Sequence, residues 1–264
     1  TSLDQAFSTR PAWRWNLPKQ TPLDAPVPFR LFSAQTPVTP LDRLRALLAD
    51  RLLVLDGAMG TMIQGLGFDE NQYRGAQFDA WNRAVHGNND LLNITQPHAI
   101  RTIHHAYFMA GADIVSTNTF SSTAIAQADY GMSGLAYDLN RAGAALAREA
   151  ALMAEREDGR RRFVAGAMGP TNKTASLSPE VNNPGYRAIS FDQLATAFKQ
   201  QARALMEGGA DLLFVHFRPS LEPLSQMRLA VQRSPLWEIL ERDYEFLSVA
   251  EAALYHSTAS VAAE

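Results

Sequence analysis

The stretch Arg51–Gln64, RLLVLDGAMGTMIQ, decides how the rest of the chain is interpreted. It opens with an apolar run at 52–55, whose length is typical of a strand buried on both faces. The run ends at Asp56, after which Gly57 and Gly60 turn the chain. Glycines let backbone N–H groups approach a ligand, so a strand that ends in a carboxylate and a glycine turn is typical of sites in α/β proteins. The same pattern also fits an ordinary loop in which Asp56 caps a turn.

Length and composition indicate a globular protein of one large or two smaller domains, with 264 residues, 46% hydrophobic and 19% charged. The net charge of -3 favours neither nucleic acid nor an anionic membrane as a partner. No apolar run approaches the roughly 20 residues that span a bilayer, and the N-terminus lacks a signal-peptide core, which together predict a cytoplasmic protein. The chain contains no cysteine, which excludes disulfides, thiolate catalysis and cysteine-ligated metal sites formed by this chain alone.

The two ends of the chain differ from its middle. Residues 1–40 hold seven of the 14 prolines and follow neither a helical nor a strand period, which predicts an irregular arm. Residues 41–216 carry the regular pattern. After His216, prolines break the chain, and we predict an unrelated helical tail at 217–264.

Within 41–216, short apolar strands alternate with amphipathic helices. Strands are expected at 52–55, 112–118, 163–168 and 211–215, and helices at 42–48, 97–110, 133–157 and 191–207. This order predicts parallel β/α units, in either a barrel or an open doubly wound sheet. No G-x-G-x-x-G follows the first strand, which disfavours a dinucleotide fold. Polar residues at all four strand ends (Asp56, Asn118, Thr171–Asn172, His216) favour a barrel, although four strands cannot close one.

Five segments, once placed on these elements, carry a resemblance to a known family. They are LVLDGAMGTMIQ (53–64), GNNDLLNITQP (87–97), AYFMAGADIVSTNTF (106–120), GAMGPTNKTASLSPEVNNPGYRAISFD (166–192) and LMEGGADLL (205–213). Together they resemble the homocysteine-binding domain of cobalamin-dependent methionine synthase, from about residue 50 to 215. The fold class that follows is α/β, of the (β/α)8 TIM-barrel family, with only about the first four β/α units present.

The resemblance implies an activity with several partners. In the family, three cysteines from the later half of the barrel hold a zinc ion, and homocysteine's sulfur binds it as a thiolate. The thiolate takes the methyl group of methylcobalamin to give methionine, and methyltetrahydrofolate recharges the cobalamin. Homocysteine and the cobalamin- and folate-binding modules are therefore the expected partners, with no nucleic acid and no membrane.

The resemblance also implies which residues bind the substrate. Asp56 matches an aspartate that meets the amino group of homocysteine, and the turn after it matches backbone that approaches the amino-acid end. The expected substrate-binding residues are Asp56, Gly57, Ala58, Met59, Gly60, Thr117, Asn118, Thr119, Gly169, Pro170, Thr171 and Asn172. We expect no catalytic and no metal-binding residue in the chain itself, and neither zinc nor cobalamin bound to it alone.

Two departures from the family shape the functional prediction. Where the family has glutamates after the second and fourth strands, this chain has Ser116 and His216. The resemblance also ends near 215, before the zinc-ligating cysteines would appear. We therefore predict the N-terminal half of the domain, inactive as an isolated chain. The alternatives are a non-catalytic remnant or frameshifted fragment, and a homocysteine-binding module without zinc chemistry.

Other conspicuous residues have plainer interpretations. Adjacent His104 and His105 diverge on a helix and do not form a metal pair. His216 alone does not replace three thiolates. Arg160–Arg162 is expected to be a solvated loop, and the alanine-rich run 142–154 a packing surface.

Overall fold

The computed structural model describes residues 39–175 and 178–216, and the expected arm and tail therefore lie outside the described residues. At the centre is a parallel sheet in the order β1-β2-β3, formed by β1 (Ile114–Ser116), β2 (Phe163–Met168) and β3 (Leu212–Val215). Val115 pairs with Val164, and Gly166 pairs with Leu213. The parallel sheet confirms the α/β class, and the division of the chain at 40 and 216 remains a prediction.

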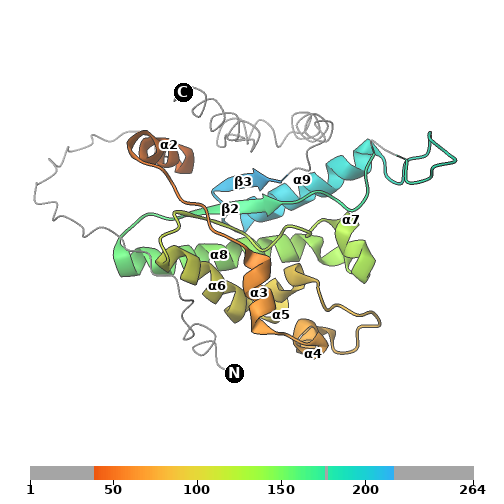
Figure 1. The fold of residues 1–264 in the computed structure, drawn as a ribbon, viewed down its shortest axis with the longest axis horizontal. Helices are drawn as coiled ribbons and strands as arrows, with labels where there is room; N and C mark the ends of the chain where they lie inside the picture. The colour runs from red at the N-terminus through yellow and green to blue at the C-terminus, as the bar shows by residue number, and fades with distance from the viewer. Residues whose placement is uncertain (1–38, 176–177, 217–264) are drawn as a thin grey trace, which may run out of the picture.

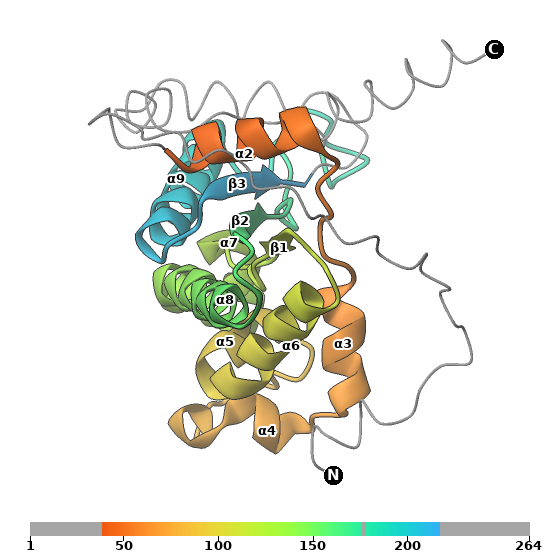
Figure 2. The same cartoon turned by 90° about the vertical axis from the view of Figure 1, so that its left-hand side faces the viewer.

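Three long helices cover one side of this sheet. They are α6 (Pro97–Met109), α8 (Ala136–Asp158) and α9 (Phe191–Glu207), and α8 runs beside the sheet with the other two packed against it (Figures 1 and 2). Alanines on α8 lie in the core against β1, β2 and α9, which confirms the predicted packing surface. Small side chains let these helices approach closely.

The remaining helices are shorter and surround this layer. The first helix, α2 (Pro40–Asp50), lies on the opposite side of β3 from α8 (Figures 1 and 2). A second apolar cluster joins α6 and α8 to elements from the long connection after the glycine turn. These elements are α3 (Met59–Leu66), α4 (Glu70–Arg74), η1 (Ala76–Phe78), η2 (Asn89–Leu91) and α5 (Leu92–Thr95), followed after β1 by α7 (Ala124–Gln127), η3 (Ala128–Tyr130) and η4 (Ser133–Leu135).

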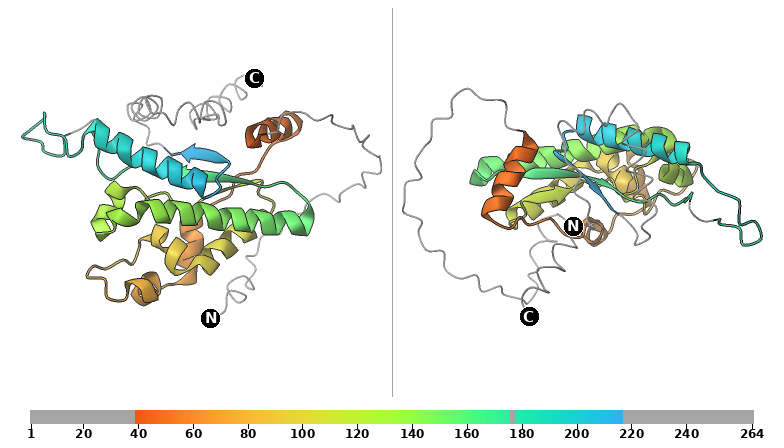
Figure 3. Two further views of the ribbon diagram at one scale, coloured as in Figure 1. Left: turned by 180° about the vertical axis from the view of Figure 1, so that it is seen from behind. Right: turned by 90° about the horizontal axis from the view of Figure 1, so that it is seen from above.

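Local signals placed α9 accurately. Ser190 accepts a hydrogen bond from the backbone N–H of Gln193, and the Gln193 side chain accepts one from the N–H of Ser190, which is a capping box. The helix ends before Gly208 and Gly209, as predicted, and the loop between β2 and α9 projects past the rest of the described chain (Figure 3). The helix that Pro97 opens is likewise confirmed.

The expected first strand differs from the prediction. The stretch 52–55 forms only an isolated parallel bridge, between Leu55 and Ile114, and is not buried on both faces. Leu52 is 86% exposed and Val54 is 55% exposed. The stretch pairs with β1 on one side, and no described residue pairs with its other side, so its apolar side chains lack cover there.

The prediction that Arg160–Arg162 is a solvated loop is only partly correct. Arg160 and Arg161 are exposed, as expected of a loop, but Arg162 is 1% exposed. Its guanidinium donates to the carboxylate of Asp158 and to the carbonyl of Phe108, 3.3 Å away. Arg162 is buried against α6, where its guanidinium carbon lies 5.7 Å from the ring centroid of Phe108. This contact joins residues 54 positions apart, which the local sequence does not indicate.

Candidate functional site

Asp56 lies at the carboxyl end of β1. Its backbone N–H donates to the carbonyl of Ile114, and its carboxylate accepts a hydrogen bond from the N–H of Ser116, both at 2.9 Å. Partial burial raises the pKa of Asp56 to about 6, and the Ser116 N–H acts in the opposite direction without cancelling it. A carboxylate whose pKa is raised by burial favours a cationic partner, because a nearby positive charge stabilises its ionised form.

The turn after Asp56 leads directly into a helix. Gly57 and Ala58 are exposed, and Met59 begins α3, in which Gly60 is the second residue. The N-cap residue, Ala58, offers no side-chain hydrogen bond to the first turn. Helix N-termini favour negative groups because their first N–H groups lack intrahelical partners. The chain therefore places a carboxylate and an uncapped helix N-terminus side by side in the sequence.

Thr117 and Thr119 face the interior of the protein. The hydroxyl of Thr117 accepts a hydrogen bond from the N–H of Ala167 at 2.8 Å and lies 2.6 Å from the hydroxyl of Thr119. Thr119 in turn donates to the carbonyl of Ala167 at 2.7 Å. Both threonines are buried, so the structure uses them to join the end of β1 to β2.

Asn118 is buried as well. Its side-chain amide donates to the carbonyl of Asn89 at 2.7 Å and to the side chain of Asn93 at 3.2 Å. Asn93 returns a hydrogen bond to the carbonyl of Asn118 at 2.7 Å. The amide groups of this pair therefore tie the end of β1 to the segment before α6, and they leave Asn118 committed to internal contacts.

Replacing Thr117 tests its structural interpretation. Thr117→Val keeps the side-chain shape, leaves the Ala167 N–H without its partner, and is expected to reduce the free energy of unfolding by about 2 kcal/mol. Denaturant unfolding at pH 7 measures this, with exposed Thr61→Val as the control. A stability equal to wild type, combined with loss of ligand binding, would instead place Thr117 in the ligand site.

The residues after β2 separate into two groups. Gly169 donates its N–H to the carbonyl of Phe120 at 3.0 Å, and a Cβ at this position would lie 2.4 Å from the same oxygen, so only glycine fits. Pro170 is partly buried beside it. Thr171 donates to the carbonyl of Lys173 at 2.6 Å, and Asn172 donates to Asp129 at 2.7 Å. The hydrogen bonds of these last two side chains therefore lead to their own loop and to η3.

His216 follows β3, where the family pattern has a glutamate. Its N–H donates to the carbonyl of Met168 at 2.9 Å, and its ring stands edge-on to Phe214 and Phe120, with centroids 4.3 and 5.2 Å away. Burial lowers the pKa of His216, so the ring is neutral at pH 7. A neutral imidazole does not supply the negative charge of a glutamate.

Sequence reasoning missed Tyr107, which the structure brings to the glycine turn. Tyr107 lies on α6, and a Cβ built on Gly57 would be 3.2 Å from its hydroxyl oxygen. The contact joins residues about fifty positions apart on different elements, so no local pattern could have found it.

The donor set does not fit the zinc site that the family resemblance implies. The sequence has no cysteine, and within 39–175 and 178–216 no three histidine, aspartate or glutamate side chains gather as metal ligands. We therefore derive no chemical step through a metal. Among the helices that the structure describes, none is long and apolar enough to cross a membrane.

Comparison with known proteins decides the family. A sequence model of the homocysteine S-methyltransferase family matches residues 53–243, which is more than half of the chain. The chain belongs to the homocysteine S-methyltransferase family. The matched range runs past His216 and includes residues outside those that the structure describes.

Solved structures of a homocysteine methyltransferase are similar to this family member. The metallated form of MmuM from Escherichia coli shares 25% sequence identity with a TM-score of 0.55, over 73% of this chain and 63% of that one. The oxidised form shares 27% identity with the same TM-score, over 73% and 62%. The chain thus spans less than two thirds of the length of the relatives it matches, and the activity of a whole enzyme does not transfer to it directly.

Proposed function

We propose that this chain is the first part of a methionine-synthase-type homocysteine S-methyltransferase domain. In this proposal the Asp56 turn binds the amino and carboxylate groups of homocysteine. The partly buried Asp56 carboxylate, next to the uncapped start of α3, carries the proposal. The ammonium group of the amino acid pairs with Asp56, and its carboxylate meets the N–H groups at the start of α3. Family membership supplies the substrate class, and the GPTNKTASLSP segment supports the methionine-synthase type.

Methyl transfer requires groups that the described residues do not supply. The reaction forms a sulfur–carbon bond on homocysteine and breaks the bond between the methyl group and its donor, for which the sulfur must be a thiolate. We propose cobalamin- and folate-binding modules as the partners that supply the methyl group. Without these modules, the isolated chain binds homocysteine but transfers no methyl group to it.

Calorimetric titration of the full chain with homocysteine tests this function, with 4-mercaptobutyrate, which lacks the amino group, as the control ligand. We expect homocysteine to bind without added zinc, the control ligand to bind at least about tenfold more weakly, and no methionine to form from methylcobalamin. Tightly held zinc at one ion per chain, with methionine formation, would show a complete enzyme instead. Failure of homocysteine to bind would favour the remnant.

A specific observation favours that second candidate, the non-catalytic remnant. Leu52, Val54 and Leu55 are exposed on a stretch that pairs on one side only. Exposed apolar sheet edges promote association and aggregation. A chain that aggregates on purification and binds no homocysteine would match this interpretation.

The pH dependence of binding follows from the pKa of Asp56. Only the ionised carboxylate pairs with an ammonium group, and a pKa of about 6 makes it mostly protonated at pH 5 and mostly ionised at pH 7. The association constant for homocysteine is therefore expected to rise about tenfold between these two pH values. Titrations at pH 5, 6 and 7 check this, and in Asp56→Asn the rise should disappear.

A further inference from the structure

The contact between Tyr107 and Gly57 leaves little room for a side chain after Asp56. The φ angle of Gly57 is not among the positive values that occur at other glycines, so the backbone there would accept alanine. Space there is tight, because an added Cβ would lie 3.2 Å from the Tyr107 hydroxyl and 3.3 Å from its ring, so the Tyr107 side chain would have to shift slightly. Carbon atoms prefer separations of about 3.5–4.0 Å. The obstacle at position 57 is therefore a single side chain.

Gly60 gives a matched comparison within the same turn. It also has an ordinary φ, and a Cβ there would meet no atom of the described residues within 4 Å. Of the two glycines in the motif, only Gly57 contacts another part of the described chain.

Tyr107 is also well placed to hold the turn. It is partly buried and packs against both apolar clusters, one beside the sheet and one among the surrounding helices. Burial raises the pKa of Tyr107, and the negative charge of Asp56 acts in the same direction, so the phenol is neutral at pH 7. The ring therefore links both apolar clusters to Gly57, the residue directly after Asp56.

We infer that Tyr107 is a positioning residue for the Asp56 turn, where its ring supports Gly57 and shields the Asp56 carboxylate from water. The inference rests on the proposed function for its meaning in binding, but both of its physical effects are measurable without a ligand. Tyr107 does not touch the reacting sulfur. It sets the place and the acidity of the group that meets the amino acid.

The first test is the titration of Asp56 in the ligand-free full chain, followed by carboxyl-carbon NMR. In Tyr107→Ala, water reaches the carboxylate, and the pKa of Asp56 is expected to fall from about 6 toward 3.8. Tyr107→Phe keeps the ring, so the pKa should stay near 6. Phe78→Ala removes a partly buried ring from the cluster among the helices and should leave the pKa unchanged. An unchanged pKa in folded Tyr107→Ala, or an equal fall in Phe78→Ala, would overturn the inference.

The second test needs no large cavity and remains valid if Tyr107→Ala fails to fold. Gly57→Ala should lower the melting temperature of the wild-type chain, and Gly60→Ala should not. In the Tyr107→Phe background, where the hydroxyl is gone, Gly57→Ala should lower the melting temperature by less. Equal losses in both backgrounds would show that Tyr107 does not restrain position 57. If homocysteine fails to bind while both tests succeed, the proposed function is wrong and the positioning of Asp56 stands.

Discussion

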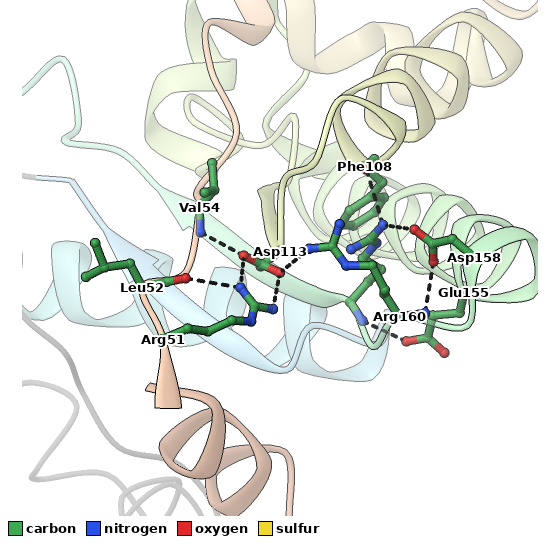
Figure 4. Close-up of polar contacts among 9 residues, drawn as sticks. Arg51, Leu52, Val54, Phe108, Asp113, Glu155, Asp158 and Arg160 are labelled. Carbon is green, nitrogen blue, oxygen red and sulfur yellow. Dashed lines mark hydrogen bonds and ion pairs between the residues drawn. The ribbon is translucent and has the colours of Figure 1, made fainter. Parts of the chain in front are cut away.

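Asp113→Asn is expected to reduce the free energy of unfolding by about 3 kcal/mol, because it removes a buried charge that two arginines surround. The Asp113 carboxylate is 1% exposed and accepts from Arg51 at 2.6 and 2.9 Å and from Arg160 at 3.2 Å (Figure 4). It also accepts from the N–H of Val54 at 2.9 Å. Breaking a buried pair costs about 3–5 kcal/mol, and the lower end applies because both arginines are partly exposed.

The pH dependence of this loss distinguishes charge from shape. Burial acts to raise the pKa of Asp113, but the hydrogen bonds and charges of its partners, Arg51 first, outweigh burial and lower it. Its contribution is therefore present above the unfolded pKa of about 3.8 and is lost as pH falls through the lower folded value. The difference between wild type and Asp113→Asn in urea unfolding should be constant from pH 5 to 8 and shrink below pH 4. A difference that does not shrink at all between pH 5 and pH 2 would mean that the asparagine side chain fits poorly at position 113 for steric reasons.

Asp211 gives the matched control, because it forms before β3 the same hydrogen bonds that Asp113 forms before β1. Asp113 and Asp211 each donate their N–H to a valine carbonyl of the preceding segment at 2.8 Å and accept that valine's N–H at 2.9 Å. The valines are Val54 and Val164, and Arg148 takes the place of Arg51. Among the described residues Asp211 has one arginine partner, and its side chain is 15% exposed, so Asp211→Asn should cost about half as much free energy of unfolding.

This repeat shows what the sequence could and could not predict. The Gly-Ala-Asp triplets at 111–113 and 209–211 are visible in the sequence, and their glycines mark helix ends as expected. Their partners lie 47 to 63 residues away, so the hydrogen bonds by which each aspartate holds the preceding segment become visible only in the fold. The helix α9 was predictable for the opposite reason, since its capping box lies within four consecutive residues.

In the candidate site, too, the sequence predicted one part and only the fold revealed the other. The strand that ends in Asp56 and a glycine turn predicted where a carboxylate would be presented, and the structure places Asp56 at the end of β1. The polar residues after β1 looked equally suitable, yet Thr117, Asn118 and Thr119 are buried and bonded internally. Residue type alone does not distinguish a polar group that faces a ligand from one that satisfies the core, because both obey the same rule that buried polar atoms be paired.

Asp56→Asn is expected to weaken homocysteine binding about a hundredfold and, unusually, to stabilise the ligand-free protein. The loss follows from removing the charge that pairs with the ammonium group, since hydrogen bonds between charged groups contribute about 1.5–3 kcal/mol. The gain follows from the raised pKa of Asp56. Because the folded-state pKa of about 6 exceeds the unfolded value of about 3.8, the stability of the wild-type protein falls as pH rises between these values and stays lower above them.

The sign of the stability change separates a binding role from a structural cap. Well below the unfolded pKa of about 3.8 the carboxyl is protonated in both states, and the two proteins should be equally stable. At pH 8 Asp56→Asn should be more stable by about 1 kcal/mol, a modest value because Asp56 is only partly buried. The carboxamide oxygen of the substituted side chain can still accept the hydrogen bond from the Ser116 N–H, so the backbone turn is retained. If Asp56 merely capped the turn, the substitution would destabilise the protein or leave it unchanged at pH 8. A group kept in the fold at a cost to stability, and needed for the ligand, is what a binding site requires.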